Sequence, residues 1–346
     1  MVNKTRFVSE ELIKKVEKAI EDLNYTPNQL ATGLRQKKTG TIGVIVSDIS
    51  IPFYSSFVKE VEEVLSPLNY SIIMGSSFYN PEKESKILAS MRAKRVDGIM
   101  LFPETDTSKE IDRIVKSGIP VVTIERKIPG SSIDGVYVDN EKAAYKATEY
   151  LIDNGHRVIA FIDRLIDKSH SVDRRNGFMK AMKDNNIKIE KDYFIRGGFT
   201  YEDGYRNAKT ILNKLPKVTA ILTFGDMSAV GAIKAINEMS LEVPKDISVI
   251  GHIDMSISRY VSPTLTTIKY PVQNMAKNAA KILFIRINKK SDIKLIKNII
   301  LTLDLIIRES TEKVIQASFF RREASFKFRK CLGIVFHTQI LHIVGT

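Results

Sequence analysis

Aromatic and polar residues follow several of the apolar runs in this sequence, and their types suit the binding of a small molecule. Phe53 and Tyr54 come after the first run, while Asp226 and Asp254 come after two later ones. Aromatic rings stack on the apolar face of a sugar or a base, and the guanidinium of Arg174 offers a fixed fork of donors to hydroxyls or a carboxylate. The plainer alternative is that the aromatic pair packs in a core and that Asp226 is an ordinary surface residue.

Catalytic chemistry is not indicated. The sequence contains no Walker phosphate-binding loop, no His-Glu-x-x-His, no Cys-x-x-Cys and no Gly-x-Ser-x-Gly. Asp163 also follows an apolar run, but no nucleophile or metal-ligand cluster stands beside it. His156, after Gly155, is expected to be a structural turn residue. We therefore predict a protein that is not an enzyme and that has no metal or organic cofactor.

The composition favours a polyanionic partner. The 346 residues include 53 Lys and Arg against 40 Asp and Glu, which gives a formal net charge of +13 at pH 7 and a pI near 9.5. The single cysteine, Cys331, excludes an internal disulfide framework and a four-cysteine zinc site. The N-terminus has no secretory apolar stretch, and no run of about 18 apolar residues suggests a membrane span. We expect a cytoplasmic protein without membrane contact.

Short apolar, β-branched runs alternate with helical stretches along most of the chain. Because strand–helix–strand connections place helices on both faces of a parallel sheet, we predict an α/β protein with two doubly wound parallel-sheet lobes. Ligands bind such sheets beyond the carboxyl ends of the strands, which is where Phe53 and Tyr54 fall. The predicted strands are 41–46, 70–74, 97–101 and 120–124, then 157–162, 193–196, 219–223 and 247–250; the predicted helices are 53–65, 81–92, 108–117, 141–154, 174–185, 201–214 and 228–239.

Residues 1–25 are expected to form a loop and one helix. Ser9 is a good N-cap residue, and Glu10 and Glu11 follow it in the first turn, where the helix dipole favours acidic side chains. Apolar residues then recur at helical spacing, which predicts one buried stripe. The residues of this stripe are Leu12, Val16, Ile20 and Leu23.

Residues 26–40 connect this helix to the α/β core. Pro27 suits the first turn of a helix, but the following stretch is too short to be a stable helix in water, and Gly33 weakens it further. A segment that is unfolded alone and basic at its end is suited to ordering on a charged partner. We predict a conditional hinge; an ordinary linker is the alternative.

Several motifs occur in a familiar order: the hinge, the strand at 41–46, Ser47-Asp48-Ile49-Ser50-Ile51-Pro52-Phe53-Tyr54, and Arg95-Val96-Asp97-Gly98-Ile99. They resemble the lactose-repressor/galactose-repressor (LacI/GalR) family of bacterial transcription factors, from Met1 to about Ser310. The resemblance implies a periplasmic-binding-protein-like core whose chain crosses between the lobes three times, here near Val138, Lys269 and Asn298. The implied lobes are 41–138 with 270–298, and 139–269 with 299–313.

The resemblance also implies DNA contacts. Residues 1–25 correspond to a partial helix-turn-helix headpiece, of which only the third helix and the end of the recognition helix, Met1-Val2-Asn3, lie in the sequence. In the family the hinge becomes a helix on operator DNA and a leucine, here Leu34, enters the minor groove, where an apolar wedge kinks the duplex. The expected DNA-binding residues are Lys4, Thr5, Arg6, Asn28, Ala31, Leu34, Arg35 and Lys37.

The effector site implied by the resemblance lies between the lobes. Its expected residues are Phe53, Tyr54, Asn140, Arg174, Phe199, Asp226 and Asp254. Arg174 opens a sequence similar to the family's Arg-x-x-Gly-Phe/Tyr, and Phe199 stands where the purine-responsive branch stacks on its ligand. Two positions depart from the family: Ile253 replaces an aspartate that grips paired hydroxyls, and Tyr270 replaces a frequent glutamine. Either the effector is atypical, or Asp254 takes over, or effector control has been lost.

We therefore predict a transcriptional repressor, acting as a homodimer on operator DNA and controlled by a small effector of the sugar or purine class. Closure of the lobes on the effector would change the spacing of the paired hinges. One alternative is an effector-binding dimer without specific DNA binding, because the base-reading part of the recognition helix is missing from the sequence. Another is a transporter-type solute-binding protein, which shares the core.

Residues 314–346 form an atypical basic and aromatic tail. Stretches such as Phe319-Phe320-Arg321-Arg322 and Phe326-Lys327-Phe328-Arg329-Lys330 show neither a helical nor a strand period. Alternating aromatic and basic residues can bind nucleic acid or an acidic surface; the alternative is an unselected extension, from a shifted reading frame or a fusion scar. We predict that the tail is dispensable for the fold.

Overall fold

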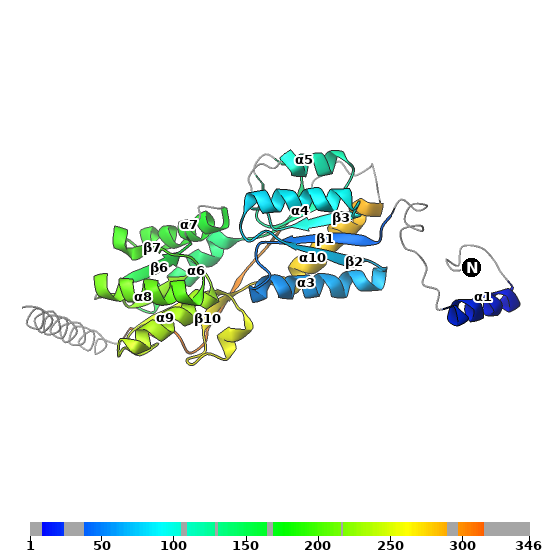
Figure 1. Ribbon diagram of the computed structural model, residues 1–346. Helices are drawn as coiled ribbons and strands as arrows, with labels where there is room; N and C mark the ends of the chain where they lie inside the picture. The colour runs from blue at the N-terminus through cyan, green and yellow to red at the C-terminus, as the bar shows by residue number, and fades with distance from the viewer. Residues whose placement is uncertain are drawn as a thin grey trace, which may run out of the picture.

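A computed structural model gives the structure of the protein, and it describes residues 9–23, 38–104, 109–128, 131–164, 169–215, 217–288 and 297–314. Two α/β lobes lie side by side along the long axis of the molecule (Figure 1). Each lobe is built on a six-stranded sheet. The eight residues expected to contact DNA all lie outside the described residues. Within the described residues, no helix is both long and apolar enough to cross a lipid bilayer.

The first lobe has a wholly parallel sheet in the order β11-β5-β4-β3-β1-β2. Helices α3 and α10 pack together on one face, and α4 and α5 cover the other (Figure 1). The strands are β1 (Thr41–Val46), β2 (Ser71–Ser76), β3 (Gly98–Leu101), β4 (Val121–Glu125), β5 (Asp134–Val138) and β11 (Asn298–Leu301). The helices are α3 (Pro52–Leu65), η1 (Ser66–Leu68), α4 (Pro81–Ala93), α5 (Lys109–Lys116) and α10 (Val272–Asn288).

The second lobe has the order β12-β10-β9-β8-β6-β7, in which β12 alone is antiparallel to its neighbour. Helices pack in two pairs, α6 with α7 and α8 with α9. The strands are β6 (Ile159–Asp163), β7 (Phe194–Arg196), β8 (Ala220–Thr223), β9 (Ser248–Ile253), β10 (Thr266–Lys269) and β12 (Asp304–Ile306). The helices are α6 (Asn140–Asp153), α7 (Ser169–Asp184), η2 (Lys191–Tyr193), α8 (Tyr201–Lys214), α9 (Asp226–Glu238) and η3 (Ser256–Arg259).

Strand β1 shows why these sequences form a doubly covered sheet. Its side chains alternate between the faces, so Val44 and Val46 join the core under α3 and α10 while Ile45 joins the core under α4. The cores on both faces of the sheet are apolar, so the sequence of β1 is a continuous run of apolar residues. Neighbouring residues also fix where some helices begin. Asn80 caps α4, and Thr200 forms a capping box at α8.

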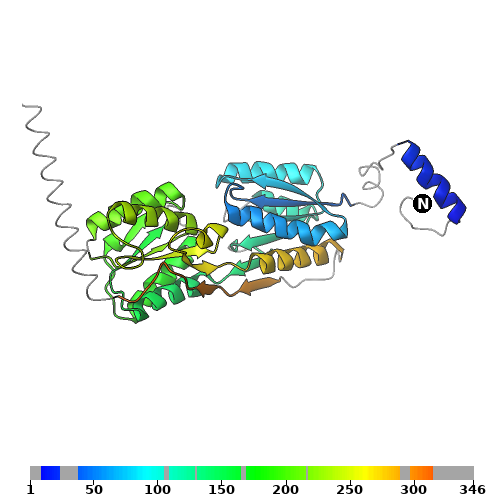
Figure 2. The same ribbon diagram turned by 90° about the horizontal axis from the view of Figure 1, so that it is seen from below.

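The chain leaves the first sheet after Val138 and the second after Lys269. The third crossing follows Leu301, so the expectation of a crossing near Asn298 is wrong. Residues 298–301 pair in parallel with β5, and this pairing keeps them in the first lobe. Figure 2 shows the two orange strands β11 and β12 end to end, one in each lobe.

Helix α1 (Glu10–Asp22) differs from the expectation of a buried stripe. Leu12 is 43% exposed and Leu23 is 76% exposed, and no described side chain covers them. An amphipathic helix buries its apolar face only against another element. Ser9 occupies the N-cap position, but its side chain makes no capping hydrogen bond.

Candidate functional site

The carboxyl ends of both sheets meet between the lobes and enclose a small cavity. This is the position at which open α/β sheets bind ligands. The space left among the side chains is about 30 Å³, enough for about two water molecules. The lining residues are Ile51, Phe53, Tyr54, Tyr79 and Glu125 from the first lobe, and Arg164, Arg174, Phe199, Phe224, Gly225, Ile253 and Met255 from the second.

Arg174 is the central polar group of this cavity and is only 1% exposed. Helix α7 begins at Ser169, so Arg174 lies in its second turn and does not head the helix as expected. Its Nε donates to Asn140 Oδ1 at 2.9 Å, and its Nη1 donates to the Phe224 carbonyl at 2.6 Å. Its guanidinium carbon lies 4.2 Å from the centroid of the Phe224 ring. These contacts fix the guanidinium in the second lobe.

Tyr270 and Glu125 extend this network to the first lobe. Arg174 Nη2 donates to the Tyr270 hydroxyl at 2.5 Å and lies 3.5 Å from Glu125 Oε1. The Tyr270 oxygen also lies 2.7 Å from Asn140 Oδ1 and 3.2 Å from Glu125 Oε1. Burial raises the pKa of Glu125, and the nearby charge of Arg174 opposes that rise. Since Glu125 ends β4 and Arg174 belongs to α7, the network joins the two lobes.

A second contact between the lobes is aromatic. The Arg164 guanidinium, which is buried, lies 4.1 Å from the centroid of the Tyr79 ring and 5.0 Å from that of Phe199. The rings of Tyr79 and Phe199 meet edge to face with centroids 5.5 Å apart. Because these groups are buried, the cation–π contact is stronger than it would be in water. Arg164, Tyr79 and Phe199 make this wall of the cavity aromatic and positively charged.

Phe53 and Tyr54 line the cavity and also pack in the core. Both are buried, and their ring centroids lie 5.8 and 5.1 Å from that of Phe102. Phe53 also meets the Tyr270 ring at 5.5 Å. The two interpretations offered by the sequence, core residues and ligand-facing residues, therefore describe the same side chains.

Asn140 and Asp226 lie outside the cavity lining. Asn140 stands behind Arg174 and orients it. Asp226 is fully buried in the second lobe, where it accepts from the Met255 N–H at 2.6 Å and from the Thr267 hydroxyl at 2.5 Å. Burial raises its pKa to about 7.

Asp254 also lies outside the lining, and two arginines form ion pairs with it. Arg308 Nη2 approaches one carboxylate oxygen at 2.6 Å, and Arg259 approaches the other at 3.3 Å. Asp254 therefore does not stand in for the carboxylate that Ile253 replaces. The Ile253 side chain lines the cavity, and its φ of +110° is unusual for a β-branched residue.

Sequence reasoning missed Tyr79, Glu125 and Arg164 as members of the site. A usable signal was present, because Glu125 is the last residue of β4, and Arg164 directly follows β6. Both positions are carboxyl ends of parallel strands, where ligand-facing residues are expected. Among the residues that the structure describes, no group of three or more His, Cys, Asp or Glu could hold a metal ion.

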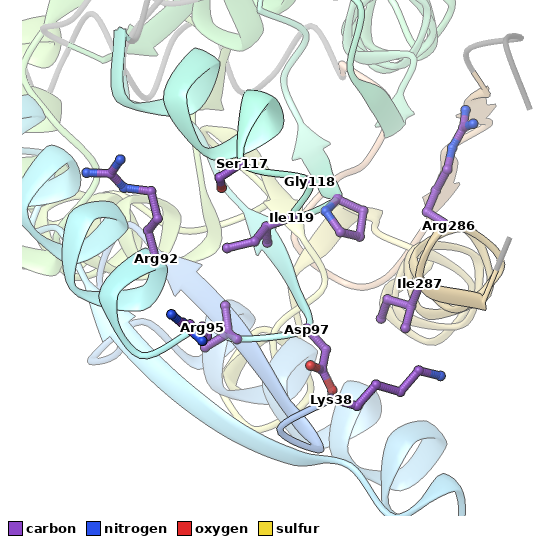
Figure 3. Close-up of a pocket in the computed structure, with 11 residues that line it drawn as sticks. Lys38, Arg92, Arg95, Asp97, Ser117, Gly118, Ile119, Arg286 and Ile287 are labelled. Carbon is purple, nitrogen blue, oxygen red and sulfur yellow. The ribbon is translucent and has the colours of Figure 1, made fainter. Parts of the chain in front are cut away.

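A larger hollow, of about 340 Å³, lies at the opposite, amino edge of the first sheet (Figure 3). It is lined by Lys38, Arg92, Arg95, Val96, Asp97, Ser117, Gly118, Ile119, Pro120, Arg286 and Ile287. Asp97 accepts from the backbone N–H groups of Thr39 and Gly40 at 2.8 and 2.9 Å, so the end of segment 26–40 is anchored here. Its lining lacks aromatic rings, so the interlobe cavity is the better candidate for a small-molecule site despite its smaller volume.

Two parallel-sheet lobes, joined by three crossings and enclosing a site at their strand ends, define a periplasmic-binding-protein-like ligand-binding core. Residues 148–311 match the family model of the periplasmic binding protein-like domain. The chain is 38% identical over 293 residues to the HTH-type transcriptional repressor PurR of Histophilus somni strain 2336. The aligned residues cover 84% of this chain and 87% of that protein.

Solved structures agree with this class. The transcription regulator CcpA of Lactococcus lactis matches with a TM-score of 0.71 and 28% identity, over 79% of this chain and 99% of that one. A LacI family transcriptional regulator from Enterococcus faecium with bound ribose matches with a TM-score of 0.72 and 26% identity, over 80% of this chain and all of that one. The protein belongs to the LacI/GalR family of transcriptional regulators.

Proposed function

We propose that this chain is a DNA-binding transcriptional repressor whose activity is controlled by a small effector bound between its lobes. The observation that carries the proposal is a cavity at the strand ends, lined by charged and aromatic side chains from both lobes, in a member of a regulator family. The similar Histophilus somni protein is named a repressor, and the similar Enterococcus faecium structure holds ribose.

The effector is proposed to be a sugar or a purine. Phe53, Tyr54 and Phe199 supply aromatic surface, and Arg174 supplies hydrogen-bond donors with fixed directions. Because Ile253 is apolar, the ligand does not use a paired-hydroxyl edge at that position. Ligand sites for such molecules are usually about 300 Å³ or more, so the lobes or their side chains have to move apart to admit one.

The chain is proposed to act as a homodimer. Strand β2 is an edge of the first sheet, and apolar side chains are exposed on it and just after it: Ile73, Met74 and Phe78, the last 54% exposed. An exposed apolar sheet edge is a ready site for association with another chain. A two-fold dimer would present two hinges to a near-palindromic operator.

The DNA contacts are proposed for the hinge, with Leu34 in the minor groove and basic residues such as Lys37 on phosphates. The hollow at the root of the hinge supports this orientation, because Lys38 and Arg95 add positive charge there beside Arg92 and Arg286, whose charges are paired with Glu110 and Asp134.

A direct test combines DNA selection with calorimetry. The full chain selects duplexes from a random library, and fluorescence anisotropy then compares the selected duplex with a random one. Calorimetry screens pentoses, hexoses, sugar phosphates and purine bases. We expect a preference for the selected duplex that one of these compounds changes. Effector binding without any preference among duplexes would replace the proposal with the effector-binding dimer that lacks specific DNA binding.

A further inference from the structure

We infer that the side chain of Tyr270, which lies directly behind the lining of the effector site, holds the two lobes closed, and that an effector which takes over its hydrogen-bond partners opens them. This inference deepens the proposed function and rests on it for the identity of the site. It concerns a residue at the crossing between β10 and α10, which belongs to neither lobe's sheet.

Tyr270 is not among the lining residues of the cavity, but its hydroxyl contacts two of them, Arg174 and Glu125. The hydroxyl accepts from Arg174 Nη2 at 2.5 Å and lies within hydrogen-bonding distance of Asn140 Oδ1 and Glu125 Oε1, at 2.7 and 3.2 Å. A phenol has one proton, so it donates to one of these oxygens at a time while the other stays in contact. When the proton points to Glu125, the phenol connects this first-lobe carboxylate to Arg174 of the second lobe; when it points to Asn140, Arg174 alone contacts Glu125.

Arg174 has little capacity left for another partner. A guanidinium has five N–H donors, and the described contacts direct donors at Asn140, the Phe224 carbonyl, Tyr270 and Glu125. Four of the five donors thus have partners, so a ligand that binds Arg174 through more than one N–H group has to replace the Tyr270 or the Glu125 oxygen. It must offer an acceptor oxygen of its own, as a carboxylate, a phosphate or a ring carbonyl does.

The surrounding packing favours the same closed arrangement. Tyr79 from the first lobe contacts Arg164 and Phe199 from the second, and the Phe53 ring packs on the ring of Tyr270. With these side chains in place the remaining space is about 30 Å³. Entry of a sugar or a base thus requires separation of the lobes.

The expected consequence concerns the direction of control. A ligand shifts a two-state equilibrium toward the state that it binds better. Because Tyr270 already bridges the closed lobes, a ligand that competes with it gains most in the open state. Such an effector opens the core, whereas an effector that merely filled an empty cleft would close it.

The test measures the interlobe distance without DNA or effector. Spin labels are placed on exposed positions of α3 and α8 through Ser55→Cys and Glu202→Cys, with Cys331→Ser removing the natural thiol. Pulsed EPR on full chain diluted with unlabelled chain then gives the distance distribution. We expect one narrow distribution for the parent and a shift to longer distances in Tyr270→Phe, which loses only the hydroxyl.

Two further variants make the test decisive. Tyr260→Phe removes a hydroxyl from a residue that is 83% exposed and should leave the distribution unchanged. Glu125→Gln removes the first-lobe charge facing Arg174 and should show the longer component as well. A folded Tyr270→Phe or Glu125→Gln variant with the parent distribution would overturn the inference. Since no ligand or DNA is used, that result is separable from a failure of the proposed function.

Discussion

Asp226 is a buried carboxyl group held by neutral hydrogen-bond donors, the Met255 N–H and the Thr267 hydroxyl. Burial raises its pKa from 3.8 to about 7, so the folded state binds this proton more tightly than the unfolded state. Its stabilising contribution is therefore fully present below about pH 4 and is lost as the pH rises toward 7. The shift corresponds to about 4 kcal/mol at most.

Asp226→Asn should remove this pH dependence, because the amide is neutral at every pH and the Thr267 hydroxyl can turn to accept from it. We expect the free energy of unfolding in urea to change less between pH 5 and pH 8 in the variant than in the parent. The exposed Asp112→Asn is the matched control and should keep the parent's pH profile. An unaltered profile in Asp226→Asn would show that Asp226 does not titrate in this range.

Ile253 combines an unusual backbone with a cavity-facing side chain. At φ +110° a β-branched residue is strained, and aspartate tolerates positive φ better. Ile253→Asp would add a carboxylate to a cavity that also contains Arg164 and Arg174. A hydrogen bond to a charged group contributes about 1.5–3 kcal/mol, so we expect the affinity for ribose to rise at least tenfold in calorimetry.

Ile253→Asn is the control for that experiment, since it has the same shape as aspartate without the charge. It should gain less affinity than Ile253→Asp. Equal gains in the two variants, or none in either, would mean that a carboxylate at this position does not face the sugar hydroxyls.

Among the elements, the stretch from Arg308 to Val314 is short but closely bound to the second lobe. Arg308 pairs with Asp254 at 2.6 Å, the Ser310 hydroxyl donates to the Val249 carbonyl at 2.6 Å, and the Val314 N–H donates to Asn154 at 2.9 Å. Ending the chain at Val314 should leave the thermal midpoint unchanged, because the sequence beyond it has no core period.

Ending the chain at Ile307 is the matched comparison, because it removes those contacts as well. It should lower the free energy of unfolding by at least about 3 kcal/mol, from lost hydrogen bonds and a carboxylate left without Arg308. Calorimetric melting of both truncations measures the difference. A large loss already at Val314 would show that the tail packs on the core.

The strand–helix alternation was predictable because buried parallel strands are continuous apolar runs, as β1 shows. Strands β5 and β10 were not predicted because Asp, Gly, Thr or Lys interrupt their apolar residues. Helix α10 was also missed, although Met275, Ala276 and Ala279 recur at helical spacing and are buried. Propensity is a weak guide for short segments, and tertiary pairing decides them.

The site was predictable only in part. Phe53 and Tyr54 lie in the first turn of α3, the helix that follows β1, so local pattern finds them. The shorter ion pair of Asp254, by contrast, is with Arg308, 54 residues away along the chain. Which carboxylate meets an arginine and which faces a cavity depends on packing between distant segments, and no local pattern contains that information.

For the whole molecule, the edge strand β2 is the proposed dimer contact. Ile73→Lys places a charge on this exposed edge, a device that prevents association of sheet edges. We expect sedimentation velocity to show a shift from dimer to monomer, with the far-UV circular dichroism of the parent. Val115→Lys alters an exposed apolar residue on α5 and should leave the dimer intact. Dissociation by both variants, or by neither, would place the contact elsewhere.

The last prediction concerns the end of the first lobe where the hinge joins it. Arg92 and Arg286 line the hollow there, and each is paired with a carboxylate, Glu110 or Asp134. Within the described part of the chain, Arg95 has no ion pair, so its charge is available to DNA. Exposed charges act over about 10 Å at 0.1 M salt, so Arg95 influences binding only if DNA lies close to this end.

Arg95→Ala should therefore weaken binding of the selected duplex and reduce the slope of log affinity against log salt by about one, as expected for the loss of one phosphate contact. Lys142→Ala, an exposed lysine on α6 of the second lobe, is the control and should preserve the slope. Anisotropy titrations between about 50 and 200 mM salt resolve the change. Equal slopes in the parent and both variants would mean that DNA stays beyond the reach of the first lobe and is held by the hinge and headpiece alone.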